Sequence, residues 1–323
     1  MSMYDFLLAA DLMVPDPDAT AKVLVEGLGL PEQKPAWRQD LPHHSYLTWH
    51  LRVHKSLAVA PTRLMAQGHK EVDQPVDPLF GPYLKHLSEV QGLARPMKSH
   101  AMVLISRSVP EIFEKLKRRK VPFRVAPIDS GLEFDRLWIG VTGADVHYDP
   151  RFDGGLYIEM MEPGPLQLPP DTWADPPPVP SDPTPGDYVR IVSRGYLVED
   201  LDETLRSLSM YLDWEPAGEV EHIAEEGYLR ARMELNLPHG ATVELIQPTR
   251  YECYSGRFVA TWGPGVYHTR IAVNGLDARA ALLAERGTGV EEMPESTAVA
   301  GRRLRVDPSS VGGALFELVE FSG

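Results

Sequence analysis

The chain has 323 residues, of which 43% are hydrophobic and 24% are charged, as in an ordinary folded protein. Its formal net charge of −14 argues against a nucleic-acid partner, because binding to phosphates needs clustered Lys and Arg side chains. Cys253 is the only cysteine, which excludes intramolecular disulfides and favours a reducing, cytoplasmic location. No apolar run approaches the roughly 18–20 residues of a membrane helix, so we expect no membrane partner either.

Taken in chain order, the hydrophobic patterns predict the same succession of elements four times. Each succession is a strand, a helix and then further strands, and the four begin near residues 5, 98, 188 and 266. The first contains strands 6–14, 45–53 and 56–62 with helix 18–30; the second, strands 100–108, 136–143 and 154–162 with helix 109–121; the third, strands 189–200, 228–236 and 241–249 with helix 201–214; and the fourth, strands 266–275, 302–308 and 312–321 with helix 276–287. Recurring units of this size indicate an internally duplicated fold.

A proline-rich segment divides the chain near its middle. Ten of the thirty prolines lie between residues 163 and 187, where they favour extended backbone and exclude a helix interior or a central strand. We therefore predict an N-terminal domain of two units over residues 1–163, a linker over 164–187, and a C-terminal domain of two units over 188–323.

One string of residues occurs twice, in the second and in the fourth unit. Residues 149–159 read DPRFDGGLYIE and residues 307–317 read DPSSVGGALFE, with the same spacing throughout. The Asp-Pro and Gly-Gly pairs predict a turn that enters the last strand of the unit. Each copy ends on a glutamate within an apolar run, and burial of that carboxylate is costly unless a cation meets it.

The succession of elements, a histidine in the first strand and a glutamate in the last strand together resemble the vicinal oxygen chelate superfamily. This superfamily includes glyoxalase I, methylmalonyl-CoA epimerase, bleomycin-resistance proteins and extradiol dioxygenases. The segments YHTRIAVNGLDARAALLAERG and DPSSVGGALFELVEF are especially similar to the epimerases. The resemblance implies an α+β fold in which four βαβββ units pair into two domains with cupped mixed sheets.

The resemblance also implies where a metal ion binds, because its ligands come from the first and last strands of paired units. The first-strand positions then correspond to Ala9, His100, Ser193 and His268, and the last-strand positions to about Leu57, Glu159, Glu244 and Glu317. We expect His268 and Glu317 to hold a divalent ion (Fe, Mn, Ni, Co or Zn), with Glu244 as a further ligand or as the base. His100 and Glu159 form a second or degenerate site. For each of these residues, packing in the core is the alternative.

Three functions follow from the resemblance, all of them with a small-molecule partner and with a possible homodimer. The first is an enzyme of the glyoxalase/epimerase type, an isomerase or lyase, in which the metal stabilises an enolate while Glu244 or Glu317 moves a proton. The second is Fe(II)-dependent cleavage of a catechol ring, which the four-unit length favours. The third is a binding or resistance protein that needs no metal.

Three further observations concern the expected ligand positions. Ser193 stands where the two-histidine, one-carboxylate triad of the ring-cleaving enzymes needs a histidine, and this counts against the second function. His50 and His54 lie on one face of a predicted strand and are candidates to replace the missing ligand, with a half-exposed strand that carries scattered histidines as the alternative. Arg270, close to the expected ligands, either contacts a bound anion or is part of the core.

Overall fold

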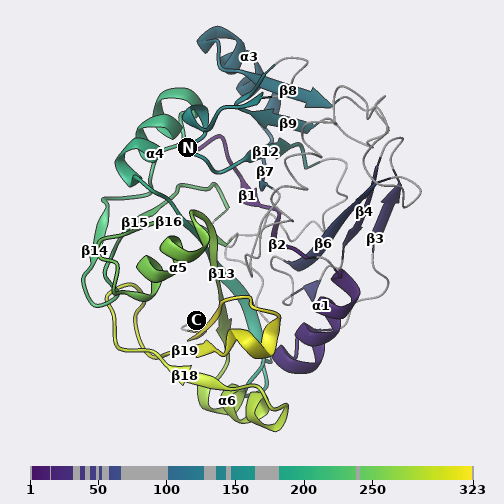
Figure 1. The fold of residues 1–323 in the computed structure, drawn as a ribbon, viewed down its shortest axis with the longest axis vertical. Helices are drawn as coiled ribbons and strands as arrows, with labels where there is room; N and C mark the ends of the chain where they lie inside the picture. The colour runs from purple at the N-terminus through teal and green to yellow at the C-terminus, as the bar shows by residue number, and fades with distance from the viewer. Residues whose placement is uncertain are drawn as a thin grey trace.

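The computed structural model describes residues 2–14, 16–31, 37–40, 44–48, 51–52, 58–66, 101–126, 136–142, 147–163, 182–237 and 241–321. Helices and β-strands alternate along the chain (Figure 1), and the strands form mixed sheets. This confirms the predicted α+β class. Among the described residues, no helix is both long and apolar enough to cross a membrane.

The C-terminal half forms one continuous eight-stranded sheet from two βαβββ units. The third unit contributes β13 (Tyr188–Leu197), α4 (Leu201–Ser207), β14 (Glu221–Ile223), β15 (Tyr228–Arg232) and β16 (Thr242–Pro248). The fourth contributes β17 (Gly265–Val273), α6 (Leu276–Glu285), β18 (Val290–Glu292), β19 (Arg303–Val306) and β20 (Phe316–Glu320). The strand order is β14-β15-β16-β13-β17-β20-β19-β18, so the two units meet where β13 and β17 pair antiparallel. A further helix, α5 (Tyr254–Trp262), lies between the units.

The described strands of the N-terminal half repeat this order. The first unit has β1 (Phe6–Leu7), β2 (Ala9–Met13), α1 (Pro17–Val23), β3 (Trp37–Asp40), β4 (His44–Thr48), β5 (Leu51–Arg52) and β6 (Ala58–Ala66). The second has β7 (Met102–Ile105), α3 (Val109–Arg119), β8 (Phe123–Ala126), β9 (Arg136–Ile139), β10 (Val141–Thr142), β11 (His147–Tyr148) and β12 (Ile158–Met161). Their sheet orders are β2-β6-β4-β3 and β1-β7-β12-β9-β8. Because β1 and β2 are almost continuous and β1 pairs with β7, the first and second units meet as the third and fourth do.

The first helices of units one and three share an unusual shape. Both begin at an aspartate whose side chain accepts a hydrogen bond from a backbone N–H of the first turn, Asp16 in α1 and Asp200 in α4. Both then continue as a π-helical turn, Leu24–Leu28 in η1 and Leu208–Leu212 in η7. Units one and three are therefore structural counterparts, and so are units two and four.

The repeated string forms the same turn in both units that carry it. Asp149 and Asp307 cap short 3-10 helices, Pro150–Phe152 (η4) and Pro308–Val311 (η8), through bonds from the backbone N–H two residues on. Each Gly-Gly pair has positive φ, at 67° and 80° in the first copy and 71° and 84° in the second. A Cβ on Gly154 would lie 2.6 Å from Thr204 of α4, and a Cβ on Gly312 would lie 3.8 Å from Thr20 of α1. The string thus builds a turn that packs on a helix of the opposite half.

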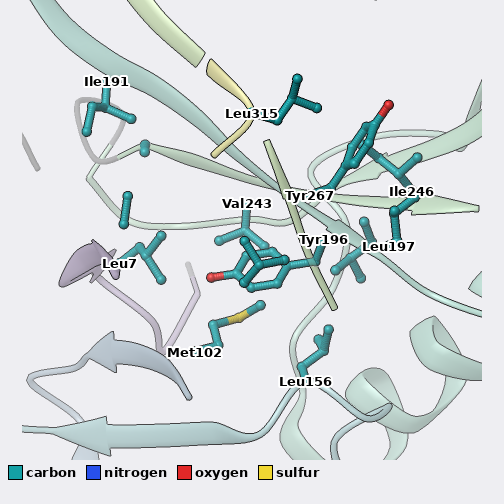
Figure 2. Packing of buried hydrophobic residues seen from close by; sticks show 14 of the residues in the cluster. Leu7, Met102, Leu156, Ile191, Tyr196, Leu197, Val243, Ile246, Tyr267 and Leu315 are labelled. Atoms are coloured by element: carbon teal, nitrogen blue, oxygen red, sulfur yellow. The ribbon is translucent and has the colours of Figure 1, made fainter. Parts of the chain in front are cut away.

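The two halves share a hydrophobic core. Tyr196 of β13 lies among Leu7 and Met102 of the N-terminal half and Val243 of the C-terminal half (Figure 2). The Tyr4 hydroxyl also crosses between the halves and donates to the backbone oxygen of Leu212 at 2.7 Å. Residues 164–181 of the predicted linker lie outside the described residues, so the division at 164–187 stays a prediction.

Candidate functional site

The central strands of the C-terminal sheet carry five polar side chains that form one buried group. Ser193 lies on β13, Glu244 on β16, His268 and Arg270 on β17, and Glu317 on β20. The strand registers place Arg270 opposite both Ser193 and Glu317, and Gly195 opposite Glu244. Each of the five side chains belongs to a residue that is at most 3% exposed. We call these five residues the polar cluster.

Arg270 occupies the middle of the polar cluster. Its Nη1 donates to Glu244 Oε1 at 3.0 Å and to Ser193 Oγ at 3.0 Å. Its Nη2 and Nε donate to Glu317 Oε2 at 2.9 and 3.1 Å. One guanidinium therefore joins the last strands of both units through the two carboxylates for which the family resemblance implied metal binding.

Two more arginines reach the same carboxylates from the neighbouring strands. Arg230 of β15 donates to Glu244 at 3.2 Å and to the Ala298 carbonyl at 2.7 Å. Arg303 of β19 lies 4.0 Å from Glu317 and is paired with Glu226 at 2.9 Å. Both arginine side chains are almost fully buried. Two carboxylates thus face three guanidinium groups, which provides the positive charge that their burial requires.

His268 contacts one carboxylate directly, and its ring has a tightly fitted place. Nε2 lies 3.2 Å from Glu244 Oε2 and 3.5 Å from Ser193 Oγ. The ring rests against Gly195, where a Cβ would come within 2.7 Å of Cε1. Among the described residues, Nδ1 has no hydrogen-bond partner. The structure therefore brings His268, Glu244 and Glu317 into one group, with Arg270 between the two glutamates.

Electrostatics keep both glutamates ionised. Burial is the largest single influence and would raise the pKa of each carboxyl group, but the charge of Arg270 and the other neighbouring cations and hydrogen bonds together outweigh it. The pKa of Glu317 falls to about 2, and His268 and Arg303 also contribute to that fall. The pKa of Glu244 is lowered further, with the hydrogen bond to His268 as a second cause. In return, the two carboxylates raise the pKa of Arg270 against the effect of its own burial.

A divalent ion does not fit this set of donors. Glu244 and Glu317 already bind the same guanidinium, so an ion between them would face Arg270 at close range, with Arg230 and Arg303 behind it. Within the described part of the chain, no three or more His, Cys, Asp or Glu side chains are arranged to hold a metal. Metal binding by His268, Glu244 and Glu317 stays a prediction that this geometry does not support.

The second unit also matches a buried glutamate with an arginine. Glu159 of β12 is fully buried, and Arg136 of β9 lies 2.9 Å from its Oε1. By strand register, Glu159 corresponds to Glu317 and Arg136 to Arg303. The sequence pattern indicated the glutamate but not the arginine, because alternation along a strand does not reveal which residues become cross-strand neighbours.

The registers correct two positions of the predicted ligand pattern. Glu159 pairs with Val103 as Glu317 pairs with Arg270, so the counterpart of His268 is Ala101 and not His100. His100 itself lies outside the described residues, and so do His50 and His54. In the first unit, Ala9 corresponds to Ser193 as expected, but the last-strand position falls on Ala60 instead of Leu57. A shift of one residue along a strand changes the face on which a side chain lies.

A cavity of about 740 Å³ lies between the two halves, apart from the polar cluster. It is bounded by the Gly154–Gly155 turn of the second unit, the end of β13 with the start of α4, and the start of β17. Tyr148 and Tyr157 stack in its wall, with ring centroids 3.9 Å apart, and Trp262 lines it from α5. Glu199, Asp200, Glu203 and Arg151 also line it, and all four are exposed.

The strand order, the paired units and the buried glutamates together define a protein built from duplicated βαβββ units. Residues 194–304, from β13 into β19, match the model of the glyoxalase/bleomycin resistance protein/dioxygenase superfamily. This match over the third and fourth units agrees with the family resemblance expected from sequence. No curated protein matched the chain in the same comparisons.

Several solved structures resemble part of the chain. The methylmalonyl-CoA epimerase of Mycobacterium tuberculosis is 24% identical over 41% of this chain and 88% of its own, with a TM-score of 0.36. A variant of the Streptomyces coelicolor methylmalonyl-CoA epimerase, in complex with 2-nitronate-propionyl-CoA, is 27% identical over 41% and 97% of the two chains, with a TM-score of 0.37. A hypothetical protein from Bacillus halodurans C-125 is 23% identical over 41% and 94%, with a TM-score of 0.37. Each likeness is limited to part of this chain and does not define its activity.

Proposed function

We propose that this protein binds a small organic molecule in the cavity between its second, third and fourth units, and that this binding needs no metal ion. The observation that carries the proposal is the cavity itself. Its volume of about 740 Å³ lies within the usual range for ligand sites, and more of its lining is apolar than polar. Stacked tyrosines and a tryptophan offer flat apolar surfaces to a ring or an acyl group.

The charges around the cavity narrow the class of ligand. Glu199, Asp200 and Glu203 lie at the cavity and are exposed to solvent. Among the described residues that line the cavity, Arg151 is the one arginine, and it is already paired with Asp149 at 2.5 Å. This arrangement favours a neutral or positively charged molecule and disfavours a polyanion such as a coenzyme A thioester.

Ligand screening with a matched pair of variants tests the proposal. Neutral aromatic compounds, aromatic amines and a coenzyme A thioester are titrated with and without EDTA, and binding is measured by calorimetry. Ser207→Trp fills the cavity, whereas Arg206→Trp adds the same ring to an exposed position of α4 that does not line it. We expect ligands that bind in EDTA, lose affinity in Ser207→Trp and keep it in Arg206→Trp. Binding that both variants retain, or that EDTA abolishes, contradicts the proposal.

Proton transfer of the glyoxalase/epimerase type, ranked first from the sequence, becomes the second candidate. The contact of 3.2 Å between His268 and Glu244 favours it, because the pair holds an acid and a base at positions that the superfamily resemblance assigns to the site. Both residues are at most 3% exposed, so a substrate has less access to them than to the cavity. Fe(II)-dependent ring cleavage has no comparable support, since Ser193 and Arg270 stand among the expected ligands.

Solvent exchange separates the second candidate from the first. Incubation in deuterium oxide with methylmalonyl-CoA and other α-acidic thioesters, followed by mass spectrometry, reports proton transfer directly. Exchange that disappears in Glu244→Gln and persists in Ser207→Trp establishes chemistry at the polar cluster. The possible homodimer and the cytoplasmic location stay predictions.

A further inference from the structure

We propose that Arg270 is the resident cation of the C-terminal half, and that its guanidinium takes the place where the superfamily resemblance implies a divalent metal ion. The polar cluster is then a metal-free set of ion pairs that ties β16, β17 and β20 together. This inference concerns the polar cluster alone, so it stands or falls independently of ligand binding in the cavity.

The contacts of Arg270 are those expected of a shared central cation. It joins carboxylates from two different units, Glu244 within 3.2 Å and Glu317 within 3.1 Å, and it also bonds Ser193. A guanidinium offers five N–H donors in a fixed plane, which suits two carboxylates and a hydroxyl at once. The arginine therefore satisfies the charges that a metal ion would otherwise neutralise.

The residues around Arg270 also suit a guanidinium and not a metal ion. Ser193, at the position where the resemblance calls for a histidine ligand, accepts a hydrogen bond from Nη1 at 3.0 Å. Serine thus offers the guanidinium a hydroxyl acceptor at a position where a histidine would offer a metal ligand. Val103 corresponds to Arg270 in the second unit, where Glu159 is met instead by Arg136. In both halves, an arginine faces the glutamate that ends the repeated string.

Cobalt binding provides a test with a readout other than activity. Purified wild-type protein, Arg270→Ala and the double variant Arg270→Ala/Ser193→His are each titrated with Co²⁺ and followed by visible absorption and by melting temperature. The double variant restores the missing histidine and removes the competing charge. His268→Ala added to each of the three proteins identifies signals that come from the polar cluster.

We expect wild-type protein to show no Co²⁺ signal that depends on His268. The double variant gains one equivalent of Co²⁺ and a higher melting temperature, because an ion that binds only the folded state stabilises it, and His268→Ala removes both effects. A variant that folds only when Co²⁺ is added supports the proposal equally. A wild-type protein that holds one equivalent of metal through His268 overturns it. A folded double variant that binds no Co²⁺ also overturns it.

Discussion

The backbone of Gly195 lies against the imidazole ring of His268, so close that a Cβ would be 2.7 Å from Cε1 and 2.8 Å from Nδ1. The ring cannot move freely, because Nε2 is held between Glu244 and Ser193. Gly195→Ala must therefore displace the ring or the strand. We expect a loss of about 1–3 kcal/mol in the free energy of unfolding, as for other overpacked cores.

A double-mutant cycle shows whether the ring causes that loss. His268→Ala removes the obstacle, so Gly195→Ala is expected to cost less in that background when unfolding is measured with urea. An equal cost in both backgrounds would mean that the glycine is needed for another reason.

Removal of one buried carboxylate charge is expected to have a large effect. Glu317→Gln leaves Arg270 and Arg303 with one partner fewer in an almost water-free environment, and such changes cost about 3–5 kcal/mol. The control is Asp277→Asn, which breaks the exposed pair with Arg302 and is expected to change stability little. Denaturant titrations of both variants measure the difference, and equal effects would show that the polar cluster is not a stabilising unit.

Acid should remove the contribution of Glu317 to the stability of the folded protein. The pKa of Glu317 is about 2 in the folded protein and about 4.5 ordinarily. Because the folded value is the lower one, its contribution to stability is complete above pH 4.5 and is lost as the pH falls from about 4.5 to about 2. Glu317→Gln is expected to flatten this part of the stability curve, measured by urea unfolding at successive pH values. An unchanged slope contradicts the assignment.

Asp153 should make stability depend on pH with the opposite sign. It is buried in the turn of the repeated string, where burial raises its pKa from 3.8 to about 7, while bonds from the Tyr148 hydroxyl and the backbone N–H groups of Gly155 and Ile158 oppose the rise. The folded state therefore retains a proton that the unfolded state releases, and stability falls as the pH rises from about 4 to about 7. Asp153→Asn should remove this fall. Tyr148→Phe removes a bond that lowers the pKa and should extend the fall to higher pH.

The contact of Tyr4 with the opposite half predicts that the two halves unfold together. Tyr4 is fully buried, packs on Trp214 with centroids 4.9 Å apart, and donates to the Leu212 carbonyl. Tyr4→Phe should cost about 1 kcal/mol through the lost hydrogen bond, whereas Tyr4→Ala should cost about 3–5 kcal/mol through the cavity it leaves. Calorimetry should show one transition, with a lower midpoint in Tyr4→Ala. Two separate transitions would instead indicate independent halves.

The amino-acid sequence by itself determined four recurring units of a strand, a helix and further strands, the turns of the repeated string and the strands that carry Glu159, Glu244 and Glu317. These features depend on local signals: alternation of apolar residues along a strand, spacing along a helix, and the torsions that Asp-Pro and Gly-Gly favour. The same signals located His268 in the first predicted strand and Glu317 in the last predicted strand of one unit. They also indicated that a cation must meet each buried glutamate.

Only the tertiary structure decided which cation that is. Arg270 of β17 reaches Glu244 of β16 across β13, the single strand that separates them in the sheet. It contacts Glu317 because the register of β17 and β20 places the two residues side by side. The replacement of His100 by Ala101 as the counterpart of His268 depends on register in the same way. The cavity likewise arises where three units meet. Strand pairing joins residues far apart in the chain, and one residue of slippage exchanges the two faces of a strand, so the local pattern does not specify these contacts.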